Sequence, residues 1–247
     1  MSKLKQLWDN YPTVAFLLPI ACFMLIGSLE PKPDADHWAG LSYSHYPIVY
    51  LTKILLTAVA VALVWTKIRE LPWKLSWLGL AVGIIGGGLW IGVCNLGLTK
   101  VIVSTLKLQA ILGSGERSAF NPLSEMADSP APALAYAFLA VRFVGLVAVI
   151  AVAEELFLRG WLIRYFGKAE QWWKVEFGKT DTVGIALTIV VPMLLHPGEL
   201  VAAALWFGMV TWLMLRTKSF GDCVVAHATT NLILGIYVVA TGHWELM

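Results

Sequence analysis

The chain contains seven apolar stretches, each close to the length that a helix needs to cross a bilayer. Such a helix requires roughly 20 mostly apolar residues, and charged or Pro- and Gly-rich breaks separate the stretches. They lie at about 12–29, 47–65, 76–98, 133–163, 182–197, 199–215 and 222–241. A helix satisfies its own backbone hydrogen bonds, which lipid cannot do. We therefore expect an all-α, polytopic membrane protein with a bundle of about seven (six to eight) transmembrane helices.

The composition agrees with a membrane protein and excludes other classes. Hydrophobic residues make up 58% of the 247 residues, charged residues only 14%, and the mean hydropathy is +0.73. Soluble chains carry about 25% charged residues. The net charge of +2 leaves no basic surplus for nucleic acid, which we exclude as a partner. Cys22, Cys94 and Cys223 lie apart in apolar stretches, so we interpret them as small apolar fillers rather than disulfides or metal ligands.

Three of the stretches are irregular. The first follows Lys3 and Lys5 as a signal peptide would, but it has no convincing cleavage site, so we expect a retained helix. The stretch 133–163 is too long for one straight span and should be tilted or broken. The fifth is short and carries Pro192 and Pro197 near its end, which is typical of a half-span or re-entrant helix.

The distribution of Lys and Arg predicts the orientation in the membrane. With seven spans and a cytoplasmic N-terminus, eleven of the 18 basic residues fall in cytoplasmic segments. These are Lys3, Lys5, Lys67, Arg69, Lys74, Arg164, Lys168, Lys174, Lys179, Arg216 and Lys218. Only Lys32, Lys100, Lys107 and Arg117 fall in the outer loops, the longest of which is about 99–132. Because short cytoplasmic loops are enriched in Lys and Arg, we expect an N-in, C-out protein. The expected location is the inner membrane of a bacterial or archaeal cell.

Three ionisable residues lie inside the long fourth stretch. Its sequence AVIAVAEELFLRGWLIRYF places Glu154, Glu155 and Arg159 in apolar surroundings. Each charge near the bilayer centre costs about 2.5–3.5 kcal/mol on insertion scales, so a plain anchor would not retain all three. Glu155 and Arg159 are four residues apart, which is the spacing of a helical ion pair. Glu154 lies about 100° further around the helix and remains available to another partner.

Polar groups in two other stretches complete a chemically suggestive set. His196 ends the fifth stretch, and His227 and Asn231 share one face of the last stretch. Peptide-bond hydrolysis needs a base that activates water, donors for the oxyanion and a proton for the leaving amine. Each residue also has a structural interpretation: the histidines and Asn231 as interhelical hydrogen bonders, and Glu155 with Arg159 as a structural pair. The pattern is specific only when the residues are taken together.

The motifs EExxxRG at 154–160, a separate His at His196 and HxxxN at 227–231 together resemble the CPBP family. These are CAAX-processing and bacteriocin-processing intramembrane proteases, including the Rce1-type prenyl-protein endopeptidases, and the resemblance covers roughly 135–240. It implies a helical bundle around a polar cavity that opens towards the cytoplasm. Pro192 departs from the family pattern, which usually has Phe four residues before the second-motif His.

The resemblance also implies roles for the site residues. Glu154 would activate the attacking water, His196 would help to position it, His227 and Asn231 would stabilise the oxyanion, and Glu155 with Arg159 would brace the site. We expect no cofactor, because the chain has no HExxH and no acceptor for the second ring nitrogen of either histidine is evident. The alternative is a zinc ion held by Glu154, His196 and His227.

We expect the chain to divide into 1–132, with N-terminal transmembrane helices and the outer loop, and 133–247, which the resemblance implies is a CPBP-like catalytic helical core. The expected function is hydrolysis of a peptide bond near the membrane in a membrane-anchored or C-terminally tailed substrate. The expected partners are membrane lipid, a membrane-anchored or exported protein substrate, and in one reading a sorting-system component. The rival interpretations are a non-catalytic chaperone or immunity-type partner and a small-solute transporter, against which the lack of internal repeats argues.

Overall fold

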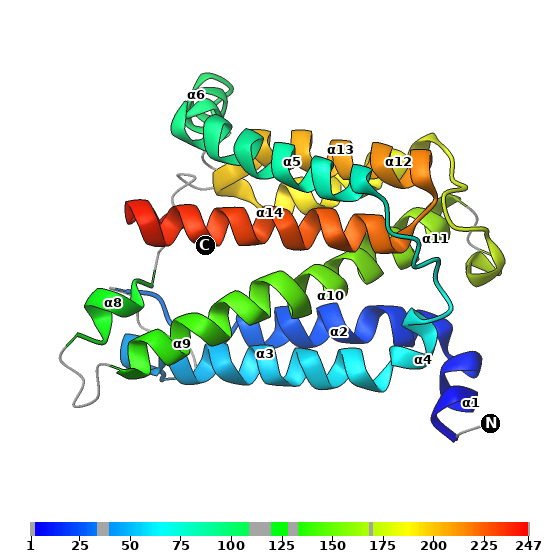
Figure 1. The fold of residues 1–247 in the computed structure, drawn as a ribbon, viewed down its shortest axis with the longest axis horizontal. Coiled ribbons are helices and arrows are strands. Elements are labelled where there is room, and N and C mark those ends of the chain that lie inside the picture. Colours follow the sequence, from blue (N-terminus) through cyan, green and yellow to red (C-terminus); the bar gives the residue numbers. More distant parts are fainter. Residues whose placement is uncertain (1–2, 34–39, 109–119, 128–132, 168–169, 247) are drawn as a thin grey trace.

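The structure is a computed structural model that describes residues 3–33, 40–108, 120–127, 133–167 and 170–246 (Figure 1). These residues form helices, turns and loops, with no strand among them. The helices are α1 (Lys3–Asn10), α2 (Pro12–Gly27), α3 (Tyr46–Leu63), α4 (Trp65–Ile68), α5 (Trp77–Asn95), α6 (Leu98–Thr105), α8 (Pro122–Glu125), α9 (Ala133–Val144), α10 (Ala151–Glu155), α11 (Ile163–Gly167), α12 (Thr182–Leu195), α13 (Leu200–Thr217) and α14 (Phe220–Thr241). Short 3₁₀ turns occupy Tyr43–His45, Trp172–Lys174, Pro197–Glu199 and Trp244–Leu246.

All seven apolar stretches are helical, so the expected all-α, polytopic membrane fold is confirmed. Five helices are long and apolar enough to cross a membrane by length and composition, and α1 with α2, bent by 97°, could form a sixth. The count of seven is therefore approximate. α12 has only 14 residues, which is short for a span, as its two prolines led us to expect.

The fourth stretch is one unbroken helix of 35 residues from Ala133 to Gly167. It winds as a π-helix over Gly145–Ile150 and again over Leu156–Leu162, where each turn holds more residues than in an α-helix. The α-helical segment α10 lies between these two segments and carries Glu154 and Glu155. The helix is therefore locally rewound rather than broken on both sides of the acidic pair.

The seven long helices alternate in direction, so their ends gather at two ends of the bundle (Figure 1). At one end lie α1, α4, α11, the last turn of α13 and the segments 69–76, 170–181 and 218–219; we call this the basic end. The backbone N–H of Phe220 donates to the carbonyl of Pro72 there, and Trp172 Nε1 donates to Thr13 Oγ1. At the opposite end lie 28–33, 40–45, 96–108, 120–127, 196–199 and 242–246. Of the long outer loop, 109–119 and 128–132 lie outside the described residues, as do Arg117 and Lys168.

Local sequence signals define several helix ends. Asp181 caps α12 by accepting a hydrogen bond from the backbone N–H of Gly184 at 2.8 Å. Ser219 caps α14 in the same way through Asp222 N–H at 3.2 Å. α14 stops at Gly242, which adopts the left-handed conformation at φ 79°. These caps fix where α12 and α14, which carry the site histidines, begin and end.

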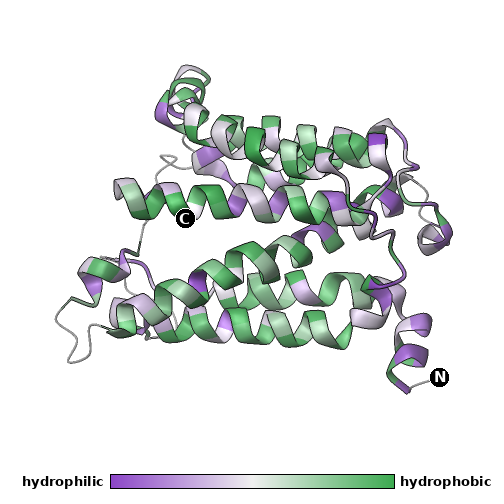
Figure 2. Cartoon of the chain, viewed as in Figure 1, coloured by the Kyte–Doolittle hydropathy of each residue, from purple (hydrophilic) through white to green (hydrophobic). Residues whose placement is uncertain are grey.

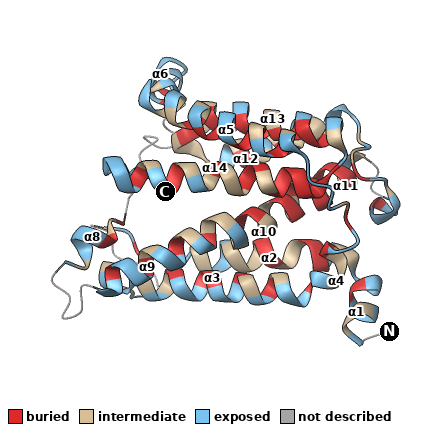
Figure 3. Cartoon of the chain, in the orientation of Figure 1, coloured by how far each residue is buried: buried red, intermediate tan, exposed pale blue. Residues whose placement is uncertain are grey.

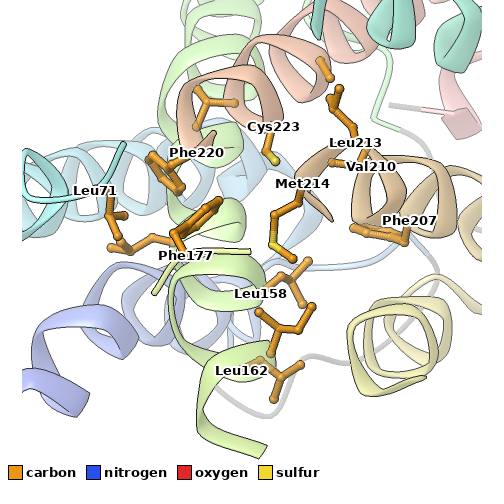
Figure 4. Close-up of a cluster of buried hydrophobic side chains, with 14 of the residues drawn as sticks. Leu71, Leu158, Leu162, Phe177, Phe207, Val210, Leu213, Met214, Phe220 and Cys223 are labelled. Carbon is orange, nitrogen blue, oxygen red and sulfur yellow. The ribbon is translucent and has the colours of Figure 1, made fainter. Parts of the chain in front are cut away.

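Hydrophobic residues dominate the long helices (Figure 2), and many of the large ones are exposed, which suits contact with lipid. Large examples include Leu55 at 63% exposure and Trp77 at 78%. The best-buried side chains, in contrast, concentrate where α10, α11, α13 and α14 meet near the basic end (Figure 3). Figure 4 shows the apolar cluster at that place. It includes Leu71, Leu158, Leu162, Phe177, Phe207, Val210, Leu213, Met214, Phe220 and Cys223.

Candidate active site

The two adjacent glutamates of α10 have different surroundings. Glu155 is fully buried, whereas the Glu154 side chain keeps 18% of its surface exposed and lines a cavity. Successive helical residues point about 100° apart, which separates the two carboxylates. One glutamate is therefore held inside the protein and the other faces open space.

Glu155 is the centre of a buried polar network. Its Oε1 accepts a hydrogen bond from Arg159 Nη1 at 2.8 Å, and both side chains have 0% exposure. Arg159 Nη2 in turn donates to the carbonyl of Phe207 at 3.1 Å and to Thr211 Oγ1 at 3.4 Å. The pair thus joins α10 to α13 as well as bridging successive turns of its own helix.

His227 of α14 contacts both glutamates. Its Nδ1 lies 2.9 Å from Glu155 Oε1, and its Nε2 lies 3.5 Å from Glu154 Oε2. The imidazole is only 6% exposed and packs edge-on against Trp206 at 4.7 Å between ring centroids. The last transmembrane helix therefore delivers its histidine directly to the acidic pair.

The contacts of Glu155 fix the hydrogen placement on His227. A carboxylate paired with Arg159 is ionised and can only accept hydrogen bonds, so His227 Nδ1 must donate its N–H. Nε2 is then the ring nitrogen that faces Glu154 and the cavity. If His227 is protonated, the charges of the carboxylates Glu154 and Glu155 and of the cations Arg159 and His227 sum to zero. A neutral set of charges suits a site removed from bulk water. Glu155 can therefore support an imidazolium that exchanges protons through Nε2.

Asn231 lies one turn beyond His227 and also lines the cavity. Its Nδ2 donates to the carbonyl of Leu146 at 2.8 Å. Leu146 belongs to the first π-helical segment, so this bond ties α14 to the helix that carries the glutamates. An amide nitrogen has two N–H groups, and the bond to Leu146 leaves the second available to a ligand.

His196 enters the same cavity from the end of α12. Its Nδ1 lies 2.7 Å from the carbonyl of Pro192, which can only accept, so Nδ1 carries the hydrogen. In a neutral imidazole Nε2 is then an acceptor. In the described structure His196 makes no hydrogen bond or ion pair with Glu154 or His227; the rings of Phe207 and Trp206 connect the two imidazoles.

The cavity itself has a volume of about 270 Å³. Its polar groups are those of Glu154, His196, His227, Thr230 and Asn231, and its other walls are mainly apolar. All four residues predicted as catalytic, Glu154, His196, His227 and Asn231, therefore line one cavity, while Glu155 and Arg159 lie buried behind it.

Two lining residues were not foreseen from the sequence. Trp206 packs on His227 and donates through Nε1 to Thr230 Oγ1 at 3.0 Å. Thr230 donates in turn to the carbonyl of Gly83 at 2.9 Å. No residue-type pattern marked Trp206, but Thr230 is one turn after His227, a spacing that could have included it.

The geometry changes the argument about zinc. Both histidines do have an acceptor for Nδ1, Glu155 and the carbonyl of Pro192, so the sequence argument from missing acceptors is wrong. The donor set nevertheless fits a metal poorly. Within the described residues, no group of three or more His, Cys, Asp or Glu side chains could hold a metal ion. Glu154, His196 and His227 line one cavity without forming such a group.

Comparison with protein families gives an independent result. Residues 136–233 match the family model described as type II CAAX prenyl endopeptidase Rce1-like. The match includes every one of the six predicted site residues, from Glu154 to Asn231. Neither a search of curated proteins nor a search of solved structures found a match. The chain is therefore an integral, multi-pass membrane protein in which residues 136–233 match the Rce1-like family of CAAX-type proteases.

Proposed function

We propose that the chain is an intramembrane endopeptidase in which Glu154 activates the water that attacks the peptide bond. The observation that carries the proposal is the position of the Glu154 carboxylate. It faces the cavity, is not paired with Arg159, and lies 3.5 Å from His227 Nε2. A general base must reach its water and must be free to accept a proton, and Glu154 meets both conditions.

The proton transfers balance within this set of residues. Glu154 takes a proton from water while the water oxygen bonds to the peptide carbonyl carbon. The resulting oxyanion accepts a hydrogen bond from His227 Nε2–H in the imidazolium form, which Glu155 supports through Nδ1. When the C–N bond breaks, Glu154 returns its proton to the leaving amine. The products are a carboxylic acid and an amine, and the site regains its starting protonation.

The other two cavity residues are assigned supporting contacts. Asn231 offers its second amide N–H to the oxyanion, while the first holds the carbonyl of Leu146. His196 accepts a hydrogen from the attacking water at Nε2, because its Nδ1–H is used by the carbonyl of Pro192. Glu155 and Arg159 position His227 rather than contact the substrate.

We further propose that the reaction needs no metal ion. The support is that Glu154, His196 and His227 line one cavity without forming, among the described residues, a group that could hold a metal ion. In this assignment the Glu154 carboxylate accepts the proton, and N–H donors stabilise the charge of the oxyanion.

The proposed substrate is a membrane-anchored or exported protein cut near the membrane. The proposed location is a bacterial or archaeal inner membrane with the N-terminal end of the chain in the cytoplasm. The support for this orientation is the charge distribution: ten of the basic residues assigned to the cytoplasm are described, and they lie at the basic end. They are Lys3, Lys5, Lys67, Arg69, Lys74, Arg164, Lys174, Lys179, Arg216 and Lys218.

The experiment is a comparison of membrane proteins from cells that carry either the wild-type chain or Glu154→Gln. New protein N-termini and C-termini are identified by mass spectrometry in each membrane fraction. We expect at least one membrane-anchored protein to be cut only with the wild type, while both chains accumulate equally. If the two sets of termini are identical, the chain is not a Glu154-dependent protease, and a non-catalytic or transport role takes its place.

A further inference from the structure

The cavity extends from the site towards one end of the bundle. Ile20 and Met24 lie in the second half of α2, Trp90 lies near the end of α5, and Leu195 ends α12. All of these positions are on the side away from the basic end. Leu246, which also lines the cavity, comes after α14 has finished at the opposite end. The cavity therefore extends from Glu154 and His227 towards the opposite end.

Packed side chains block the path between the site residues and the basic end (Figure 4). Leu158 forms part of the cavity wall and is only 2% exposed. Behind it, Met214 and Phe220 have 0% exposure and Phe177 has 7%. Such packing leaves no room for a peptide, because protein interiors have few voids larger than a water molecule.

The closed end is also the end with the basic residues. Ten described Lys and Arg residues lie there, and the described part of the opposite end has only Lys32, Lys100 and Lys107. Short segments rich in Lys and Arg stay in the cytoplasm. The charge distribution and a cavity that opens to the cytoplasm, which the family resemblance implies, therefore cannot both hold for this structure.

We infer that the cavity opens to the non-cytoplasmic side of the membrane and that the protease cuts exported, membrane-anchored proteins from that side. The substrate class rests on the proposed function, whereas the direction of opening rests on the fold and on the distribution of basic residues. A cytoplasmic prenylated tail would meet the closed end and could not reach Glu154.

The depth of the site sets a requirement on the substrate. Fifteen residues separate His227 from Gly242 along α14, which corresponds to about 22 Å of helix. An extended peptide covers about 3.3 Å per residue, so about seven residues must enter before the scissile bond reaches His227. The walls along this path include Phe23, Met24 and Leu195. The entering segment should therefore be extended and mainly apolar.

The test is labelling of single cysteines with a membrane-impermeant maleimide. The background carries Cys22→Ala and Cys94→Ala; Cys223 stays because it is fully buried. The test position is Leu146→Cys inside the cavity. Lys179→Cys, exposed at the basic end, and Lys32→Cys, exposed at the opposite end, serve as matched controls. If Leu146→Cys lowers the yield of folded protein, Leu246→Cys replaces it.

When the reagent is added outside spheroplasts, we expect it to label Leu146→Cys and Lys32→Cys but not Lys179→Cys. When it is added to inverted vesicles, we expect it to label Lys179→Cys. Labelling of Leu146→Cys only in inverted vesicles would overturn the inference. The same labelling is repeated with Glu154→Gln, where it should be unchanged because it needs no catalysis. Cleavage that persists in Glu154→Gln would refute the proposed function and leave the direction of opening standing, so the two failures are distinguishable.

Discussion

Glu155 shows how far single residues can be understood from the sequence. Its pairing with Arg159 follows from the four-residue spacing, because neighbours on one helix are fixed by helical geometry. Its contact with His227, 72 residues away, depends on how two helices pack and has no local signal. The same holds for the bond between Asn231 and the carbonyl of Leu146. Sequence therefore predicted the candidate residues but not the contacts between helices.

The first prediction concerns Arg159. Arg159→Ala should lower the folded yield and the thermal midpoint, because it leaves the buried Glu155 carboxylate without its cation. Breaking a buried pair costs about 3–5 kcal/mol. The measurement is thermal unfolding in detergent, with Arg216→Ala as the control because Arg216 is an exposed cation near the end of α13. An Arg159→Ala protein that is inactive but as stable as the wild type would place Arg159 in the chemistry instead.

The second prediction concerns Glu155 as a positioning residue. Glu155→Gln can still accept the hydrogen of His227 Nδ1, but it removes the negative charge that supports an imidazolium. We expect kcat to fall while KM stays near the wild-type value, because the interaction matters most in the transition state. Steady-state kinetics of the folded variant measures both. A rise in KM with unchanged kcat would mean that Glu155 serves substrate binding.

Among the contacts between helices, the packing of α5 against α14 sets the position of His227. A Cβ at Gly83 would come within 2.6 Å of Thr229 Cβ and 2.7 Å of the Ala226 carbonyl, so the two helices touch through glycine. Close approach of membrane helices through small residues is a general packing mode. The spacing of Gly79, Gly83 and Gly87 in the sequence was a signal of this contact that our sequence analysis did not use.

The third prediction follows from this contact. Gly83→Ala should push α14 away from α5, lower the thermal stability by about 1–3 kcal/mol as overpacking does, and reduce activity by moving His227. Gly88→Ala is the matched control on the same helix, since a Cβ there meets nothing within 4 Å. Thermal unfolding and cleavage rates of the two variants are compared. Equal stability of both variants would show that the close contact at Gly83 has no role.

Helices were easier to foresee than their irregularities. The apolar runs predicted every long helix, because a segment in lipid must satisfy its own backbone. The prolines indicated the short α12, and a structured C-terminal turn there lets His196 bond the carbonyl of Pro192. The two π-helical segments beside α10 were not predicted, although each contains one glycine, Gly145 and Gly160.

At the scale of the whole molecule, the direction of the cavity was the feature least accessible to sequence. Charge counting predicts which loops face the cytoplasm, but it does not show which end of the bundle is packed shut. That depends on side chains from several segments, such as Leu71, Phe177 and Phe220, meeting in one cluster. Together, the two kinds of information support our inference that the cavity opens on the non-cytoplasmic side of the membrane.

The fourth prediction concerns metal. If the attacking water is not bound to zinc, purified protein treated with a chelator should retain its cleavage rate. Elemental analysis should then find less than about one zinc per chain. The control is the same preparation with zinc added after chelation, which should change nothing. Loss of activity on chelation, restored by stoichiometric zinc, would show that Glu154, His196 and His227 act through a metal.

The most direct test of the account is the cleavage rate of purified Glu154→Gln on the substrate found in the membrane comparison. Gln keeps the shape of the side chain but cannot accept a proton from water, and a general base contributes about 10²–10⁴ in rate. Glu176→Gln, which changes an exposed carboxylate at the basic end, is the control. We predict a loss of that size for Glu154→Gln with unchanged folding and a normal rate for Glu176→Gln. A near wild-type rate for Glu154→Gln would contradict the central claim.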